Sequence, residues 1–140
     1  MTAPVRETSP NTLQKILAFA AAMEVGTGLV LVISPAIVVT LLLGADASGV
    51  GTLVGRFFGV SLFALGVACW PAWQRAESAS PAFRAMLVYN ALIATYLAYL
   101  GTAGHLGGLL LWPAVALHAV VALLLAWTWR DNRRIKATNE

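Results

Sequence analysis

Long apolar segments alternate with short polar connections along the chain. The four segments 13–33, 50–70, 82–102 and 109–129 contain very few charged residues. Each has about 20 residues, and at about 1.5 Å per helical residue this length matches a hydrocarbon core about 30 Å thick. The pattern therefore predicts four membrane-spanning helices in a single domain, 1–140, followed by a basic tail over 130–140.

A shorter apolar run, from Ala36 to Leu43, follows the first segment. Ser34 and Pro35 precede it and Gly44 follows it, which is typical of the start and the end of a helix. A run of this length covers only about 13 Å and is too short to cross a membrane. We expect a short interfacial helix here, with a continuation of the first span past a proline kink as the alternative. The predicted fold class is all-α integral membrane, a bundle of four transmembrane helices with this short helix after the first span.

Composition supports a membrane protein. Of the 140 residues, 59% are hydrophobic and 11% are charged, whereas about a quarter of the residues in a soluble domain are charged. The single cysteine permits no internal disulfide. The small net charge of +3 gives no indication of nucleic acid binding.

Basic residues lie at one side of the predicted membrane. They occur before or at the start of the first span, around the connection between the second and third spans, and after the fourth span, whereas the other two connections contain none. Because basic residues stay in the cytoplasm, we expect both termini and the central connection to be cytoplasmic, with the two other short connections outside. The basic residues outside the spans or at their ends are Arg6, Lys15, Arg75, Arg84, Arg130, Arg133, Arg134 and Lys136.

Away from the ends of the spans, the acidic, basic and histidine side chains are Glu24, Arg56 and His118. A charge inside a bilayer costs a few kcal/mol or more, so it usually faces an opposite charge, water or protein. Counted from the inner end of each span, Glu24 and His118 lie at a depth of about 16 Å and Arg56 at about 21 Å. We therefore expect an ion pair between Glu24 and Arg56, with His118 at the level of the carboxylate. Such a pair either fixes the packing of the helices or forms a functional centre, and the sequence leaves both interpretations open.

Further polar side chains are secondary candidates: Thr27, Asn90 and Tyr96. Thr27 lies on the same helix face as Glu24. Asn90 lies between about 12 and 18 Å deep, depending on where the third span starts. Tyr96 shares a face of the third span with Tyr89, and the two rings either line a pocket or face lipid.

The second span carries glycine at every fourth position: Gly51, Gly55 and Gly59. Small residues at this spacing are typical of close helix packing in membranes. We expect the stripe to contact another helix of the bundle or another subunit. The oligomeric state stays open.

The chain resembles the small bacterial four-helix membrane proteins grouped as DoxX-like and related families. The resemblance is carried by the run GRFFGVSLFALG around Arg56, by Glu24 and by four spans in 140 residues. The resemblance covers most of the chain in topology. It implies a compact inner-membrane bundle without an agreed enzymatic activity, in some cases an accessory protein of another membrane system. No catalytic residue is carried over from it.

Three classes of function follow from these features. The first is a small accessory or scaffold subunit, which binds other membrane subunits or a second copy of the chain. The second is a ligand-binding or proton-linked transport unit centred on Glu24, Arg56 and His118, with a small apolar or anionic ligand. The third is a membrane enzyme that acts on a lipid or quinone-like substrate, with Glu24 or His118 as general acid or base.

The sequence argues against several other chemistries. Only Glu24 and His118 share a depth, which is too few ligands for a metal site, and no cofactor motif is present. We therefore expect no metal and no cofactor, and an enzyme is the least favoured class. The expected surroundings are membrane lipid and other membrane proteins, without nucleic acid.

Overall fold

The computed structural model describes residues 12–71 and 80–138, with side chains as far as Asp131. Every regular element within these ranges is a helix: α1 (Thr12–Ile33), α2 (Pro35–Leu43), α3 (Val50–Ala68), α4 (Pro81–Thr102) and α5 (Leu111–Thr138). Four of them are long and apolar enough to cross a membrane, namely α1, α3, α4 and the part Leu111–Asp131 of α5. The predicted fold class, with four spans and a short helix after the first, is confirmed. Arg6 and Arg75, used for the orientation, lie outside the described residues.

The local sequence explains where α2 and α4 begin and end. Pro35 is in the first turn of α2, and Gly44 ends this helix in the left-handed conformation with φ 68°, which glycine adopts without steric penalty. At the start of α4, the Ser80 hydroxyl accepts a hydrogen bond of 3.2 Å from the Phe83 backbone N–H. Pro81 occupies the first turn, where its missing N–H leaves no hydrogen bond unmade.

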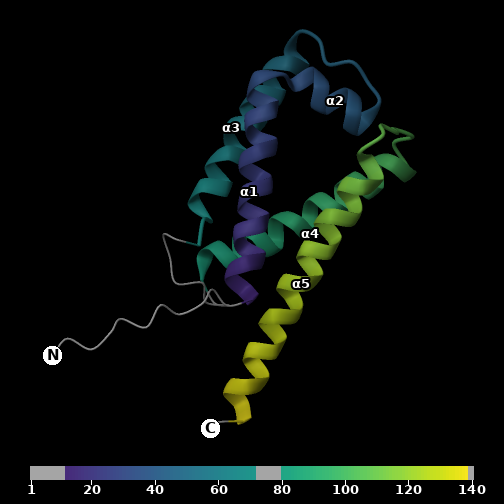
Figure 1. The fold of residues 1–140 in the computed structure, drawn as a ribbon. Helices are drawn as coiled ribbons and strands as arrows, with labels where there is room; N and C mark the ends of the chain where they lie inside the picture. Colours follow the sequence, from purple (N-terminus) through teal and green to yellow (C-terminus); the bar gives the residue numbers. More distant parts are fainter. Residues whose placement is uncertain (1–11, 72–79, 139–140) are drawn as a thin grey trace, which may run out of the picture.

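The last helix is longer than the sequence indicates. The sequence predicts that the fourth span ends at about Trp129 and that a basic tail follows; the helix α5 itself continues to Thr138. No glycine or proline lies between 130 and 138 to end the helix. At about 1.5 Å per residue α5 is about 42 Å long, so its final turns extend beyond a hydrocarbon core of about 30 Å. Figure 1 shows this end of α5 projecting past the other helices.

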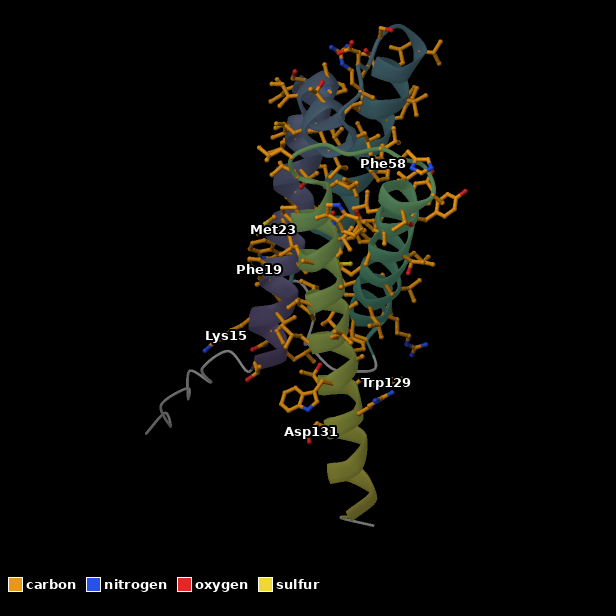
Figure 2. All side chains as sticks on the ribbon, turned by 90° about the vertical axis from the view of Figure 1, so that its right-hand side faces the viewer. Lys15, Phe19, Met23, Phe58, Trp129 and Asp131 are labelled. Carbon is orange, nitrogen blue, oxygen red and sulfur yellow. The ribbon has the colours of Figure 1, made fainter. Side chains whose placement is uncertain are left out.

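The long helices form two pairs. α1 packs along α3, and α4 packs along α5, while contacts between the pairs are fewer (Figure 1). Lys15 near the start of α1 and Trp129 and Asp131 on α5 lie at the same end of the molecule (Figure 2). This end is called the inner end below, after the predicted topology. The orientation in the membrane stays a prediction.

Glycines set the close packing of α1 against α3. A Cβ atom at Gly28 would lie 2.7 Å from the Gly59 carbonyl oxygen, and one at Gly59 would lie 2.8 Å from the Gly28 oxygen. Nearer the inner end, a Cβ at Gly66 would lie 2.7 Å from the Ala21 oxygen and 2.9 Å from the Val25 nitrogen. Side chains at these positions would force the two backbones apart, so the pair depends on glycine at the crossing points.

The predicted stripe on α3 is divided among different surroundings. Gly59 contacts α1, as just described, and a Cβ at Gly55 would lie 2.8 Å from the Pro35 side chain of α2. A Cβ at Gly51 would have nothing within 4 Å. The stripe therefore packs within the chain at two of its three positions.

An apolar core joins the two pairs near the inner end. It contains residues from α1, α4 and α5 and Cys69, which directly follows α3, and its largest fully buried members include Phe83, Leu17, Met86 and Leu125. Buried apolar side chains from α1 thus meet those of α4 and α5. The cluster comprises Leu13, Leu17, Ala20, Ala21, Cys69, Ala82, Phe83, Met86, Val121 and Leu125.

At the other end, α2 binds the connection between α4 and α5 through backbone atoms. The last carbonyls of any helix lack partners within the helix. Here the Leu41 oxygen accepts a hydrogen bond of 2.8 Å from the Leu110 N–H, and the oxygens of Leu42 and Leu43 accept bonds of 3.3 and 3.2 Å from the 107–108 backbone. We call these three bonds the outer backbone bridge. They satisfy carbonyls that would be costly to leave unpaired near a membrane.

The outer surface of the helices is apolar. Phe57, Leu123, Leu92 and Phe19 are 74%, 69%, 65% and 50% exposed, respectively. Large exposed apolar areas are rare on soluble monomers. With four helices able to span a bilayer, they indicate an integral membrane protein whose outer surface faces lipid.

A buried polar centre as the candidate functional site

Glu24 lies in the middle of α1 and is only 3% exposed. It sits between two glycine crossings with α3, at Gly28 and at Gly66. Its carboxyl group is hydrogen-bonded to the side chain of Tyr89 on α4. This bond links the two helix pairs, since α1 belongs to one and α4 to the other.

Asn90, the next residue on α4, connects to α5. Its Oδ1 lies 2.8 Å from Nδ1 of His118, and its side-chain nitrogen donates a hydrogen bond of 2.8 Å to the Met86 carbonyl. The His118 ring also meets the Tyr89 ring edge to face, with centroids 6.0 Å apart and planes at 81°. We call the four side chains Glu24, Tyr89, Asn90 and His118 the polar centre.

The helical repeat explains how two adjacent residues reach two different helices. Successive side chains on a helix point about 100° apart. Tyr89 therefore turns to α1, while Asn90, only 2% exposed, turns to α5. Three helices contribute to the centre. The close packing at Gly28 and Gly66 positions Glu24, and the hydrogen bond from Asn90 to the Met86 carbonyl orients the amide.

Arg56 is not part of this centre. It is an exposed residue on α3. Gly66 is level with Ala21 and Val25, which bracket Glu24, and Arg56 precedes Gly66 by ten residues (66 minus 56), or about 15 Å along the helix. No hydrogen bond or ion pair between the Glu24 and Arg56 side chains is present among the described residues.

The depth estimate from the sequence failed at one specific assumption. It counted each span from its own inner end, as if these ends were level. In the structure α1 continues from Ala21 back to Thr12, whereas α3 stops at Ala68, two residues after Gly66. Glu24 is therefore level with the inner part of α3, and Arg56 lies far toward the outer end. The predicted common level of Glu24 and His118 agrees with their shared contact to Tyr89.

Of the secondary candidates, one belongs to the polar centre and two do not. Asn90 is in the centre, as described. Thr27 is half-buried on α1, and the structure does not connect it to the centre. Tyr96 is 57% exposed and stacks on Tyr99, with centroids 6.5 Å apart. Tyr89 is the member that sequence reasoning left undecided; its position beside Asn90 in the middle of a span was the available signal.

The donors and acceptors of the centre define its chemistry. It offers a carboxyl group, a phenol hydroxyl, an amide and an imidazole, which together can bind and exchange protons or orient a small polar ligand. Within the described ranges, no group of three or more His, Cys, Asp and Glu side chains is placed to hold a metal ion.

Comparisons with other proteins add no family to this picture. Neither a protein-family model, nor a curated protein, nor a solved structure matches the chain. The function is therefore inferred from the residues and their geometry.

Proposed function

We propose that the protein is a small membrane-embedded binding or transport unit whose ligand site is the polar centre around Glu24. The observation that carries this proposal is a carboxyl group that is 3% exposed in the middle of a span and hydrogen-bonded to Tyr89 from the other helix pair. Ionisable groups inside the membrane typically mark substrate and ion pathways.

A purely structural role explains the carboxyl group less well. Polar side chains do hold membrane helices together through hydrogen bonds. A glutamine at position 24 would accept the same bond from Tyr89 without the free-energy cost of placing a charge in a low-dielectric region. A carboxyl group at this position is better explained by an exchangeable charge or by a ligand.

The experiment uses the full chain in proteoliposomes. Currents on a solid-supported membrane are recorded after concentration jumps of protons, sodium, a small amine and a small organic anion. We expect charge displacement for at least one of these in the parent protein and its loss in Glu24→Gln. Asp46→Asn, which changes an exposed carboxylate outside the spans, should keep the parent signal.

Circular dichroism and melting in detergent establish that the Glu24→Gln variant is folded. A folded Glu24→Gln protein with the same currents as the parent would refute the proposal. Currents no larger than those of protein-free liposomes for every jump would do the same.

A second candidate, an accessory subunit, has support from Arg56. This side chain is exposed on a membrane span, and Phe57 beside it is 74% exposed. A charge on a lipid-facing surface is costly unless it reaches the headgroups or meets a partner. A neighbouring membrane helix that carries a carboxylate would supply that partner.

Photocrosslinking in intact cells tests this second function. A crosslinking residue in place of Phe57 should give a discrete adduct that disappears in the Arg56→Leu background. The same residue in place of Phe19, which is 50% exposed on α1, is the control. Equal adducts from both positions would contradict a specific contact at Arg56.

We also propose a location in a bacterial inner membrane with both termini in the cytoplasm. Support comes from the basic residues of the sequence and from Lys15 and Asp131, which lie at one end of the molecule (Figure 2). A relation to the DoxX-like proteins stays a proposal based on the sequence resemblance.

A further inference from the structure

The hydrogen-bond network of the polar centre can be assigned from its fixed end. The Asn90 side-chain nitrogen donates to the Met86 carbonyl, which orients the amide and leaves Oδ1 as an acceptor. His118 Nδ1, 2.8 Å from that oxygen, must therefore carry a hydrogen and donate it. In a neutral imidazole the other nitrogen, Nε2, is then an acceptor.

The Glu24 carboxylate has more acceptor positions than the hydrogen bond from Tyr89 occupies. The Tyr89 hydroxyl has one hydrogen, which it donates to the carboxylate. A carboxylate has about four lone-pair positions, so acceptor capacity remains on Glu24 as well as on His118 Nε2. The centre accepts a hydrogen-bond donor or a positive charge and offers little to an anion.

The titratable groups around Glu24 also favour a positively charged ligand. α4 presents Tyr89, and α5 presents His118. On α3, Arg56 is exposed about 15 Å farther out. Cys69, which directly follows α3, is buried in the apolar core near the inner end. α2 has no titratable side chain. No described cation balances an ionised Glu24, so the charge that the site lacks is positive.

We infer that the ligand of the polar centre is a proton, bound and released by the Glu24 carboxylate beside the Tyr89 hydroxyl. This inference rests on the proposed function and names its ligand. Binding forms one O–H bond on the carboxylate with a proton delivered by water, and release returns the proton to water. Within the described ranges Glu24 is the only carboxylate of the centre, and no group of three or more His, Cys, Asp and Glu side chains is placed to hold a metal ion.

Infrared difference spectroscopy of the full chain in lipid nanodiscs tests the inference at equilibrium, without any transport. Spectra are compared between mildly alkaline and mildly acidic pH. The parent should show a protonated carboxyl band that Asp46→Asn retains and Glu24→Gln loses. Tyr89→Phe should shift the band, because the hydrogen bond to Glu24 is gone. Glu24→Asp keeps a carboxyl group and should give a band at a changed frequency, which covers the case of an unfolded glutamine variant.

Two results would overturn the inference. A parent spectrum without a pH-dependent carboxyl band assigned to residue 24 would exclude proton exchange there. A band that sodium removes at constant pH would identify a metal cation as the ligand. The outcomes are separable from those of the proposed function: a titrating band without currents leaves a proton site that does not transport, and currents without the band leave a transport site for another ligand.

Discussion

Mutant cycles on stability distinguish the partner found in the structure from the partner expected from the sequence. One cycle combines Glu24→Ala with Tyr89→Phe, and the other combines Glu24→Ala with Arg56→Met. We expect a coupling free energy of about 0.6 kcal/mol, and at most about 1.7 kcal/mol, between Glu24 and Tyr89, the range of hydrogen bonds between membrane helices. Their direct bond is the physical reason.

The second cycle should give a small value. Over about 15 Å, with an effective dielectric constant of about 20, two unit charges interact by about 1 kcal/mol. Arg56 is exposed, and Cβ atoms tilt toward the N-terminus of a helix, here the outer end, which increases the separation from Glu24. We therefore expect a coupling of about 1 kcal/mol or less, whereas double-mutant cycles on close charge pairs give couplings of about 1.5 to 7 kcal/mol.

Reversible unfolding in mixed micelles supplies the free energies, since the four proteins of each cycle are compared under one condition. A coupling above about 2 kcal/mol between Glu24 and Arg56 would refute the reasoning, because no contact in the structure could produce it. A coupling of zero between Glu24 and Tyr89 would show that their hydrogen bond contributes nothing to stability.

Three further predictions follow from the packing and the topology. Gly59→Ala should destabilise the protein by about 1 to 3 kcal/mol, as overpacking does, because its Cβ would lie 2.8 Å from backbone of α1; Gly51→Ala, with open space around it, should be neutral in the same melting experiment. Gly108→Ala should speed amide hydrogen exchange at the outer backbone bridge, because its Cβ would clash with the Leu41 carbonyl, whereas Gly107→Ala has nothing within 4 Å and should leave exchange unchanged. A cysteine in place of Asp46 should react with an external thiol reagent in intact cells and one in the C-terminal tail should not, and the reverse result would invert the topology.

The helices could be predicted from the sequence because their signals are local. Apolar length, Ser80 with Pro81 at the start of α4, and Gly44 at the end of α2 each act within a few residues. The extension of α5 was missed because the end of an apolar segment is not the end of a helix. The length of an apolar segment indicates how much of a helix lies in the bilayer, whereas glycine and proline indicate where the helix ends.

The polar centre could be predicted only in part, because its geometry depends on helix register. The sequence identifies Glu24 and His118 as intramembrane groups that need partners. The partner of each group depends on the register of the helices against one another. For α1 and α3, contacts such as that of Gly28 with Gly59 set this register. In the structure Arg56 lies about 15 Å from the level of Glu24 along α3, instead of the expected offset of about 5 Å, and Tyr89 of α4 is the neighbour; the sequence pattern does not encode this register.

The placement of the polar centre between the helix pairs predicts what its ligand changes. Inside the first pair, Gly28 and Gly59 bring backbones together so closely that little movement is available. Between the pairs, the Glu24 to Tyr89 bond lies between the apolar core and the outer backbone bridge. A ligand shifts a conformational equilibrium only through contacts that differ between the two states, and protonation of Glu24 alters this bond. We therefore expect spin labels on the lipid-facing sides of α1 and α4 to change distance between acidic and alkaline pH, with labels on α1 and α3 unchanged. A change within the first pair instead, or the same change in Glu24→Gln, would separate the polar centre from any movement of the helices.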